Sequence, residues 1–379
     1  MELQIFFNSL DLNLFQENKL DSLGAQVVGY QDTFPDWRSY SLAIFGVEEE
    51  RGATLNKGTG KGPNEIRKKL YSLKKINSSI QLVDLGNLRA GVTIEETYLR
   101  VKEVCEVLIT HQVIPIILGG SHDLDYGQYM AYENLSQLVN IVNVDAFLDL
   151  EQDDVNKHLT HTYKILTHQP NYLFNFSQIG YQAYLNSDIE ILSLEKFYFD
   201  CWRLGKVRES ISKLEPVLRD ADMVSFDVTA IKMADAPGNQ RAQPFGLTGE
   251  EACQLAWYAG ISDRITSIGF YEYNPEIDHR EQTSSVVATM VWYFIEGFHK
   301  RKGEKNFESA SFFQYKVDFP DHAIQLCFYK SKVSEKWWME SPILSASKKI
   351  IIACDYEDYQ LATQGILPER WVMLQSKFG

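Results

Sequence analysis

The most constraining feature of the sequence is a series of short apolar runs, each followed by a longer segment with helical periodicity. The runs are rich in β-branched and aromatic residues and cover residues 41–47, 113–120, 138–146, 223–228 and 265–273. Runs of this length without polar alternation are typical of strands buried on both faces. The amphipathic segments between them, residues 62–75, 93–112 and 247–260, are each long enough for a crossover helix. This alternation predicts an α/β fold with a doubly wound parallel sheet.

The character of the sequence changes towards the C-terminus. Residues 301–306 form a charged stretch typical of a linker, and the apolar runs within 324–331 and 348–359 predict further strands. Aromatic residues are frequent in this part of the chain. We therefore expect a main α/β domain over residues 1–300 and a C-terminal extension over residues 301–379 that packs on it.

The charge and the cysteines restrict the partners and the compartment that we expect. The 37 Lys and Arg and 51 Asp and Glu residues give a net charge of −14, which would repel a nucleic acid backbone or an anionic membrane surface. The five cysteines are scattered without a CxxC pair, as is typical of free thiols in a reducing compartment. The N-terminus lacks a basic leader, and no apolar run approaches the roughly 18 residues of a membrane span. We expect a cytoplasmic protein.

Ionisable residues stand at the carboxyl ends of three predicted strands. They are His122 after the second apolar run, Asp145 and Asp149 at the end of the third, and Asp227 in the fourth. In open parallel sheets, ligands collect in the crevice beyond the carboxyl ends of the strands. One imidazole with three carboxylates makes an oxygen-rich site that favours manganese, with magnesium or iron as alternatives.

Each of these four residues, taken alone, has an ordinary structural explanation. A histidine in the position of His122 is commonly a hydrogen-bonded turn residue. An aspartate in the position of Asp145 or Asp149 is more often a helix cap or a solvated loop acid. Their joint occurrence at three strand ends is what predicts a metal site.

Six segments of the chain resemble motifs of the ureohydrolase family, which comprises arginase, agmatinase and formiminoglutamase. GGSHD, DAFLD and SFDVTAIKMADAPG resemble the family's metal-binding motifs. GTGKGPNEIRKKL, FGLTGEEA and YEYNPEID resemble three further family segments, and all six occur in the family's order over roughly residues 40 to 300. The continuation HDLDYGQ is most similar to the formiminoglutamase branch.

This resemblance implies an arginase-like three-layer fold and two manganese ions bound through six positions, with a shared hydroxide as nucleophile. The ligand set of the first ion maps onto His122, Asp145, Asp149 and Asp227. Two ligands that belong to the second ion alone are replaced, a histidine by Phe147 and an aspartate by Thr229. A phenyl ring cannot coordinate a metal and a neutral hydroxyl is a poor substitute for a carboxylate. We therefore expect one manganese ion rather than a pair.

The resemblance also implies roles for three further residues. His161 matches the family's proton-shuttling histidine, and Glu251 matches the acid that holds the substrate's cationic group. Arg241 would bind an anionic substrate such as formiminoglutamate. Each has an alternative: a surface histidine, a first-turn helix glutamate favoured by the helix dipole, and a solvated loop arginine. Further residues that would restore part of the second site's charge are His158, His161, Asp123 and Asp235.

Two functions follow as leading hypotheses. The first is a manganese-dependent hydrolase that cleaves a C–N bond of a small amidine or guanidino amino acid, with formiminoglutamate giving glutamate and formamide. The second is a catalytically inactive homologue that serves as a binding or regulatory protein, since both ligands of the second site are lost together. A metal-free structural protein fits less well because the first ligand set is complete. The resemblance further implies a homo-oligomer.

Overall fold

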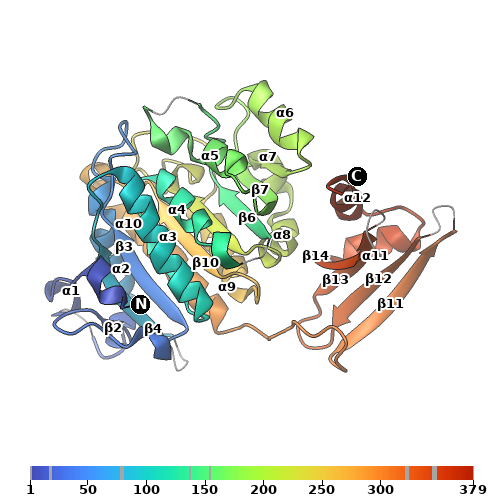
Figure 1. Cartoon of the computed structure of the whole chain (residues 1–379), viewed down its shortest axis with the longest axis horizontal. Coiled ribbons are helices and arrows are strands. Elements are labelled where there is room, and N and C mark those ends of the chain that lie inside the picture. Colours follow the sequence, from blue (N-terminus) through green and yellow to red (C-terminus); the bar gives the residue numbers. More distant parts are fainter. Residues whose placement is uncertain are drawn as a thin grey trace.

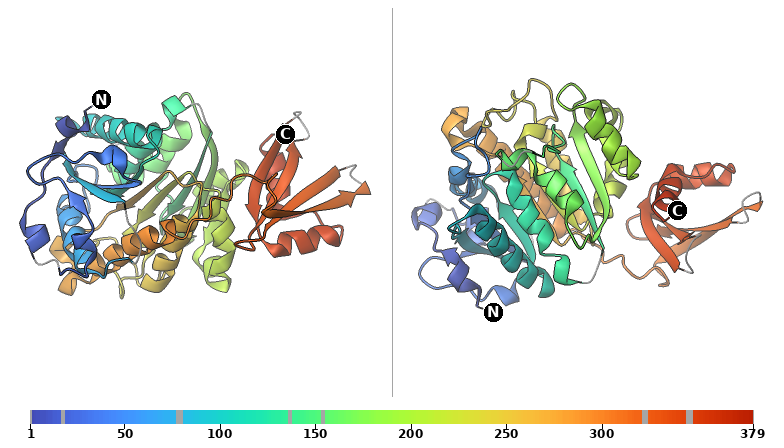
Figure 2. Two further views of the ribbon diagram at one scale, coloured as in Figure 1. Left: turned by 90° about the horizontal axis from the view of Figure 1, so that it is seen from below. Right: turned by 45° about the horizontal axis from the view of Figure 1, so that its top comes forward.

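A ten-stranded, mostly parallel sheet forms the centre of a large α/β body, and a smaller β unit follows it at the C-terminus (Figure 1). The structure is a computed structural model that describes residues 2–16, 19–76, 81–135, 138–152, 155–320, 324–343 and 348–378. Figure 2 shows from two further sides that the C-terminal unit lies beside the α/β body and is joined to it by an extended segment.

The strands of the large sheet are arranged as in a doubly wound fold. Their order is β1 (Phe7–Asn8), β4 (Leu82–Leu88), β3 (Leu42–Val47), β5 (Ile114–Leu118), β10 (Ser267–Tyr271), β9 (Met223–Asp227), β6 (Val139–Val144), β7 (Leu173–Tyr181) and β8 (Asp200–Arg203), with β2 (Val28–Gly29) also paired to β4. Strand β1 is antiparallel to β4, and the other pairings are parallel. The predicted fold class is confirmed.

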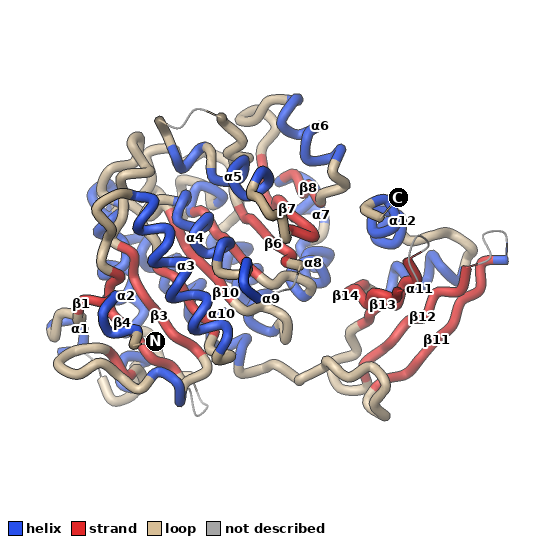
Figure 3. The backbone as a smooth tube through the Cα atoms, viewed as in Figure 1, coloured by secondary structure: helices blue, strands red, loops and turns tan. Residues whose placement is uncertain are grey.

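The five strands that the apolar runs predict all lie at the centre of this sheet. They are β3, β5, β6, β9 and β10, and every residue in them is buried. Helices cover both faces of the sheet (Figure 3), which is why these strands lack polar alternation.

The helices form the two outer layers. One face carries α2 (Gly62–Ser72), α8 (Leu214–Arg219), α9 (Gly249–Ile261) and α10 (Gln282–Phe298), and the other carries α3 (Ile94–Thr110), α4 (Asp125–Met130) and α5 (His161–Thr167). The α/β body also contains α1 (Asn13–Gln16), α6 (Asp188–Lys196) and α7 (Leu204–Glu209). Among the helices in the described ranges, none has the length and apolar character needed to cross a membrane.

The C-terminal unit is an antiparallel meander with two helices. It comprises β11 (Phe312–Phe319), β12 (Ile324–Ser331), β13 (Trp337–Ile343), β14 (Lys348–Cys354), α11 (Tyr356–Thr363) and α12 (Glu369–Ser376). Phe328, Met339 and Trp371 belong to its own apolar core. The unit contacts the α/β body where the Asp220 carboxylate accepts a hydrogen bond from the backbone N of Ala353 at 2.8 Å. The domain boundary at residue 300 stays a prediction.

Candidate metal centre

The predicted ligands converge at one edge of the sheet because they follow neighbouring parallel strands. His122 opens a short 3-10 helix (His122–Leu124) after β5, Asp145 follows β6, and Asp227 is the last residue of β9. The spatial order β5-β10-β9-β6 brings their carboxyl ends together. The turn before His122 is close to other backbone, since a Cβ atom on Gly120 would lie 1.8 Å from the carbonyl oxygen of Glu49. This contact explains why glycine is required there.

The donor atoms of these residues form a tight, buried cluster. Nδ1 of His122 lies 3.3 Å from Oδ2 of Asp145 and 3.0 Å from Oδ2 of Asp227. Donor atoms of four residues all lie within 4.8 Å of one another, namely those of His122, Asp145, Asp149 and His161. All five side chains are buried. The structure thus brings three of the predicted ligands into one group with His161 and places the fourth, Asp227, beside His122.

Two atoms at the centre of the cluster lack a hydrogen-bond partner in the described part of the chain. They are Nδ1 of His122 and Oδ2 of Asp145. Buried polar atoms are nearly always hydrogen-bonded, so an exception needs an explanation such as an ion. A divalent cation between the carboxylates and the imidazole would pair both atoms, and the residues present therefore fit one such ion.

A second layer of hydrogen bonds fixes the tautomer of His122. The Ser225 hydroxyl donates to Oδ2 of Asp125 at 3.0 Å, because a carboxylate only accepts. Ser225 Oγ also lies 2.8 Å from Nε2 of His122, so this nitrogen must carry the proton that the hydroxyl accepts. Burial lowers the pKa of His122, but Asp145 and Asp227 outweigh it and raise the pKa above its usual value. When the imidazole gives up the proton on Nδ1, this nitrogen faces both carboxylates in the form that binds a metal.

His161 is held in a similar way. Its Nδ1 lies 2.9 Å from Oδ1 of Asp125, and its Nε2 lies 3.3 Å from Oδ2 of Asp149. Burial lowers the pKa of His161, but the charges of Asp125 and Asp149 outweigh it and raise the pKa to about 9. The predicted proton shuttle therefore lies inside the cluster with one nitrogen facing a predicted ligand.

Asp149 takes a strained backbone conformation at the cluster. Its φ of 49° lies in the left-handed region, which a residue other than glycine adopts at a cost. Oδ1 of Asp149 lies 3.7 Å from Nη1 of Arg241, whose Cζ is 3.5 Å from the centroid of the Phe147 ring. Burial raises the pKa of Asp149, but His161 and Arg241 together hold it below its usual value. Arg241 is thus part of the cluster.

Glu272 is a cluster residue that the sequence analysis did not single out. It follows β10, and its carboxylate accepts hydrogen bonds from the backbone N of His122 at 3.0 Å and from Nδ2 of Asn56 at 2.7 Å. It is buried with a φ of 67°, and burial together with the charge of Asp227 raises its pKa to about 7. Its position in the segment YEYNPEID, directly after a predicted strand, was the available signal. Asp125 and Ser225 likewise stand within the quoted motifs.

Glu251 is engaged elsewhere. It forms a capping box with Thr248 at the start of α9, where its carboxylate accepts from the backbone N of Thr248 at 2.7 Å. The hydroxyl of Thr248 accepts in return from the backbone N of Glu251 at 3.1 Å. These bonds correspond to the helix-start alternative, and none of the described contacts of Glu251 reaches the cluster.

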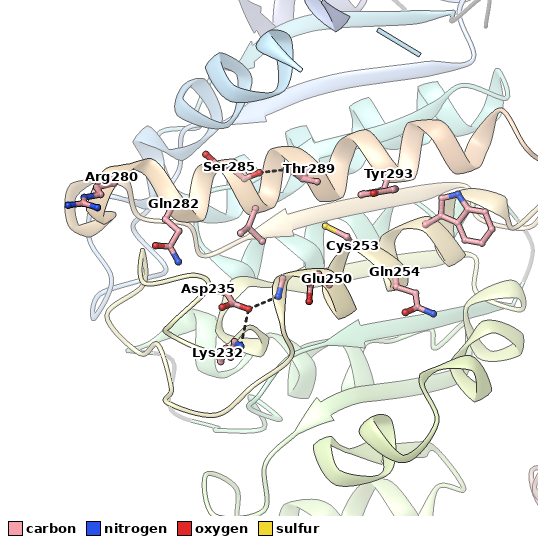
Figure 4. Close-up of a pocket in the computed structure, with 13 residues that line it drawn as sticks. Lys232, Asp235, Glu250, Cys253, Gln254, Arg280, Gln282, Ser285, Thr289 and Tyr293 are labelled. Atoms are coloured by element: carbon pink, nitrogen blue, oxygen red, sulfur yellow. Dashed lines mark hydrogen bonds and ion pairs between the residues drawn. The ribbon is translucent and has the colours of Figure 1, made fainter. Parts of the chain in front are cut away.

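The other residues proposed to restore charge are engaged in separate contacts. Asp123 accepts a hydrogen bond from the Tyr98 hydroxyl, and Nδ1 of His158 lies 2.7 Å from the carbonyl oxygen of Gly52. Asp235 lines a cavity of about 1070 Å³ between α9 and α10, where it contacts Lys232 (Figure 4). The lining of this cavity includes none of the cluster residues.

The sequence matches a known protein family over most of its length. The profile of the Arginase family matches residues 40–296, which is more than half of the chain. The chain belongs to the arginase family. The predicted ureohydrolase resemblance is confirmed, and the matched range contains every residue of the cluster.

Relatives of this arginase-family chain include two formimidoylglutamases. That of Staphylococcus haemolyticus is 27% identical over 290 residues, covering 74% of this chain and 88% of the relative. The enzyme of Staphylococcus aureus (strain MRSA252) is 26% identical over 266 residues, covering 67% and 86%.

Solved structures share the fold. The formiminoglutamase of Trypanosoma cruzi with Mn2+2 has a TM-score of 0.65 at 21% identity and covers 78% of this chain and 100% of its own. The formimidoylglutamase of Bacillus subtilis has a TM-score of 0.64 at 19% identity, with 79% and 93% covered. At these identities the structural likeness supports the fold alone.

Proposed function

We propose that this arginase-family chain is a metal-dependent hydrolase that cleaves the C–N bond of a small amidine, with formiminoglutamate as the first candidate substrate. One manganese ion would be held by His122, Asp145, Asp149 and Asp227. The observation that carries the proposal is a pair of buried atoms without a hydrogen bond, Nδ1 of His122 and Oδ2 of Asp145, which face each other across 3.3 Å. The formimidoylglutamase relatives support the substrate class.

When bound, the ion would supply Lewis acidity that makes water nucleophilic near neutral pH. The residues of the chain then move the protons. His161 with a pKa raised to about 9 would carry a proton on Nε2 at neutral pH and donate it to the leaving amine. Asp125, at 2.9 Å, fixes the ring by accepting from Nδ1. The metal-binding side chains are buried, so the substrate would react away from bulk water.

The roles of Arg241 and Glu251 at the substrate stay predictions. The Arg241 guanidinium already faces Asp149, and the Arg241 side chain is 17% exposed. An anionic substrate group could contact only this exposed part. Glu251 would have to leave its capping box to contact a substrate. A homo-oligomeric state also stays a prediction.

A second candidate function is a binding or regulatory protein without turnover. The observation that favours it is the replacement at Phe147 and Thr229, whose side chains are engaged with Arg241 and Asp145. Such a protein would retain the fold and one ion but would lack the second cation that its family normally uses.

Metal content and turnover separate the two candidates. We expect the purified chain to bind about one manganese ion, to lose it in His122→Ala, and to keep it in His111→Ala, an exposed histidine outside the cluster. Mass spectrometry of the metal measures this, and an assay for formamide release from formiminoglutamate measures activity. A bound ion with no turnover of formimino or guanidino substrates would favour the second candidate, and failure to bind any ion would refute the proposed site.

A further inference from the structure

The cluster contains a positive charge that belongs to the protein itself. Arg241 is the guanidinium nearest to the carboxylates among the described residues, with Nη1 3.7 Å from Oδ1 of Asp149. Its plane packs on Phe147, since Cζ lies 3.5 Å from the ring centroid. Contact with an aromatic face stabilises a cation that has lost part of its water. The side chain is only 17% exposed, so its charge acts in a weakly screened environment.

The loop that carries Arg241 is tied to the site. The backbone N of Arg241 donates to Oδ1 of Asn239 at 2.6 Å, and Nδ2 of Asn239 donates to the backbone carbonyl of Glu272 at 2.8 Å. Nε2 of Gln243 donates to the carbonyl oxygen of Arg241 at 2.7 Å. Because these bonds hold the backbone on both sides, the guanidinium is placed at the cluster by the fold.

The residues at positions 147 and 229 also hold Asp145, the first through its backbone and the second through its side chain. Oδ1 of Asp145 accepts from the Thr229 hydroxyl at 2.8 Å and from the backbone N of Phe147 at 2.9 Å. An oxygen with two hydrogen bonds has little capacity left for a cation. Oδ2 of Asp145, which has no such partner, is left for one ion beside His122. The two oxygens of one carboxylate are therefore committed to different partners.

We propose that Arg241 is the second cation of this cluster and restricts it to a single metal ion. The inference rests on the single-ion site of the proposed function. One divalent ion and one guanidinium match the three negative charges of the ligand carboxylates, those of Asp145, Asp149 and Asp227. The charge on His161 is paired separately with Asp125. A second divalent ion would meet uncompensated repulsion from Arg241, whatever ligands were offered to it. Arg241 is thus a positioning residue that sets metal stoichiometry through Asp149 and Phe147.

The test restores the missing ligands with and without Arg241. Phe147→His with Thr229→Asp supplies an imidazole and a carboxylate, and the triple variant adds Arg241→Gln. We expect about one manganese ion per chain in the double variant and about two in the triple variant. The matched control adds Arg208→Gln instead, because Arg208 is an exposed arginine in α7 that donates to the Gly246 carbonyl. It should stay at about one ion.

Three other results would overturn the inference. Two ions in the double variant, with Arg241 present, would overturn the inference and leave the single-ion site of the wild type standing. One ion in both variants would also overturn it, because removing Arg241 would then open nothing. No ion in the wild type would overturn the proposed function together with the inference.

If circular dichroism shows that the triple variant is unfolded, the single variant Arg241→Gln tests the same proposal. Arg241→Gln alone removes the charge that competes for Asp149, so we expect manganese to bind at least roughly tenfold more tightly than in wild type. Isothermal titration with manganese chloride measures the dissociation constant, with Arg208→Gln as the control that should not change it. Unchanged or weaker binding in Arg241→Gln would refute the role of Arg241.

Discussion

The guanidinium of Arg219 lies over the ring of Trp338, with Cζ 4.3 Å from the ring centroid. This contact joins α8 of the α/β body to β13 of the C-terminal unit. The same guanidinium donates to the backbone carbonyls of Trp337 and Cys354, each at 2.9 Å. Arg219 is only 6% exposed, so one buried side chain links three residues of the C-terminal unit to the body.

Arg219→Ala is expected to loosen the C-terminal unit. It removes the cation–π contact and two hydrogen bonds to backbone carbonyls, which should cost about 2–4 kcal/mol of docking free energy. Limited proteolysis should then cut faster between α10 and β11. Arg203→Ala, at an exposed arginine, is the control. Equal cleavage rates in wild type and Arg219→Ala would show that docking does not depend on this contact.

Lys377 should make the docking of α12 depend on pH. Burial beside the rings of Phe174 and Phe199 lowers the pKa of Lys377 to about 8. The unfolded chain would keep its proton up to about pH 10.4, so it binds more protons than the folded chain between these values. The contribution of Lys377 to the free energy of unfolding therefore rises as the pH increases from about 8 to about 10.4.

The measurement compares melting temperatures of wild type and Lys377→Met between about pH 7 and about pH 10. The melting temperature of wild type, relative to that of Lys377→Met, should rise as the pH rises. Lys206→Met, at an exposed lysine of α7, should show a constant difference from wild type. A constant difference for Lys377→Met as well would mean that this amine is not destabilised by burial.

Ser225 should control metal affinity without binding the ion. Its hydroxyl accepts from Nε2 of His122 and thereby fixes the tautomer that presents Nδ1 to the carboxylates. Ser225→Ala should weaken manganese binding by about 10- to 100-fold, as other partners of metal-binding histidines do. Ser177→Ala, at a buried serine of β7 that donates to Asp200, should bind manganese as wild type does. The dissociation constants from titration calorimetry decide between these outcomes.

The sequence could predict the central strands of the sheet, including β6 with its buried Asn140 and Asn143, but it missed β4. Strand β4 contains Asp84 and Asn87, and both are buried. Their partner is Arg67 in α2, which donates to both. Because such compensation comes from a residue on another element, no local pattern reveals the strand.

Part of the candidate site could also be predicted from the sequence. His122, Asp145 and Asp227 could be predicted to lie together because parallel strands end at one edge. The packing of Arg241 on Phe147 could not, because it joins loops that follow different strands and depends on the path of each loop. A sequence motif records which residues follow a strand, but not which of them turn back towards the crevice.

The Arg67–Asp84 pair allows a test of how buried charge is tolerated in this core. Nε and Nη2 of Arg67 lie 2.8 Å and 3.0 Å from the two carboxylate oxygens of Asp84, and both side chains are completely buried. Tyr71 also donates to this carboxylate. Arg67→Met should therefore leave an uncompensated buried charge and lower the free energy of unfolding by about 3–5 kcal/mol.

Removing the charge as well should recover part of this loss. Arg67→Met with Asp84→Asn leaves a neutral amide that still accepts from Tyr71, so the double variant should be more stable than Arg67→Met alone. Urea unfolding followed by circular dichroism measures both, with Arg100→Met in α3 as a control at a less buried arginine. If the double variant were less stable than Arg67→Met, the loss in the free energy of unfolding would come from lost packing and hydrogen bonds. The buried charge itself would then not be the cause.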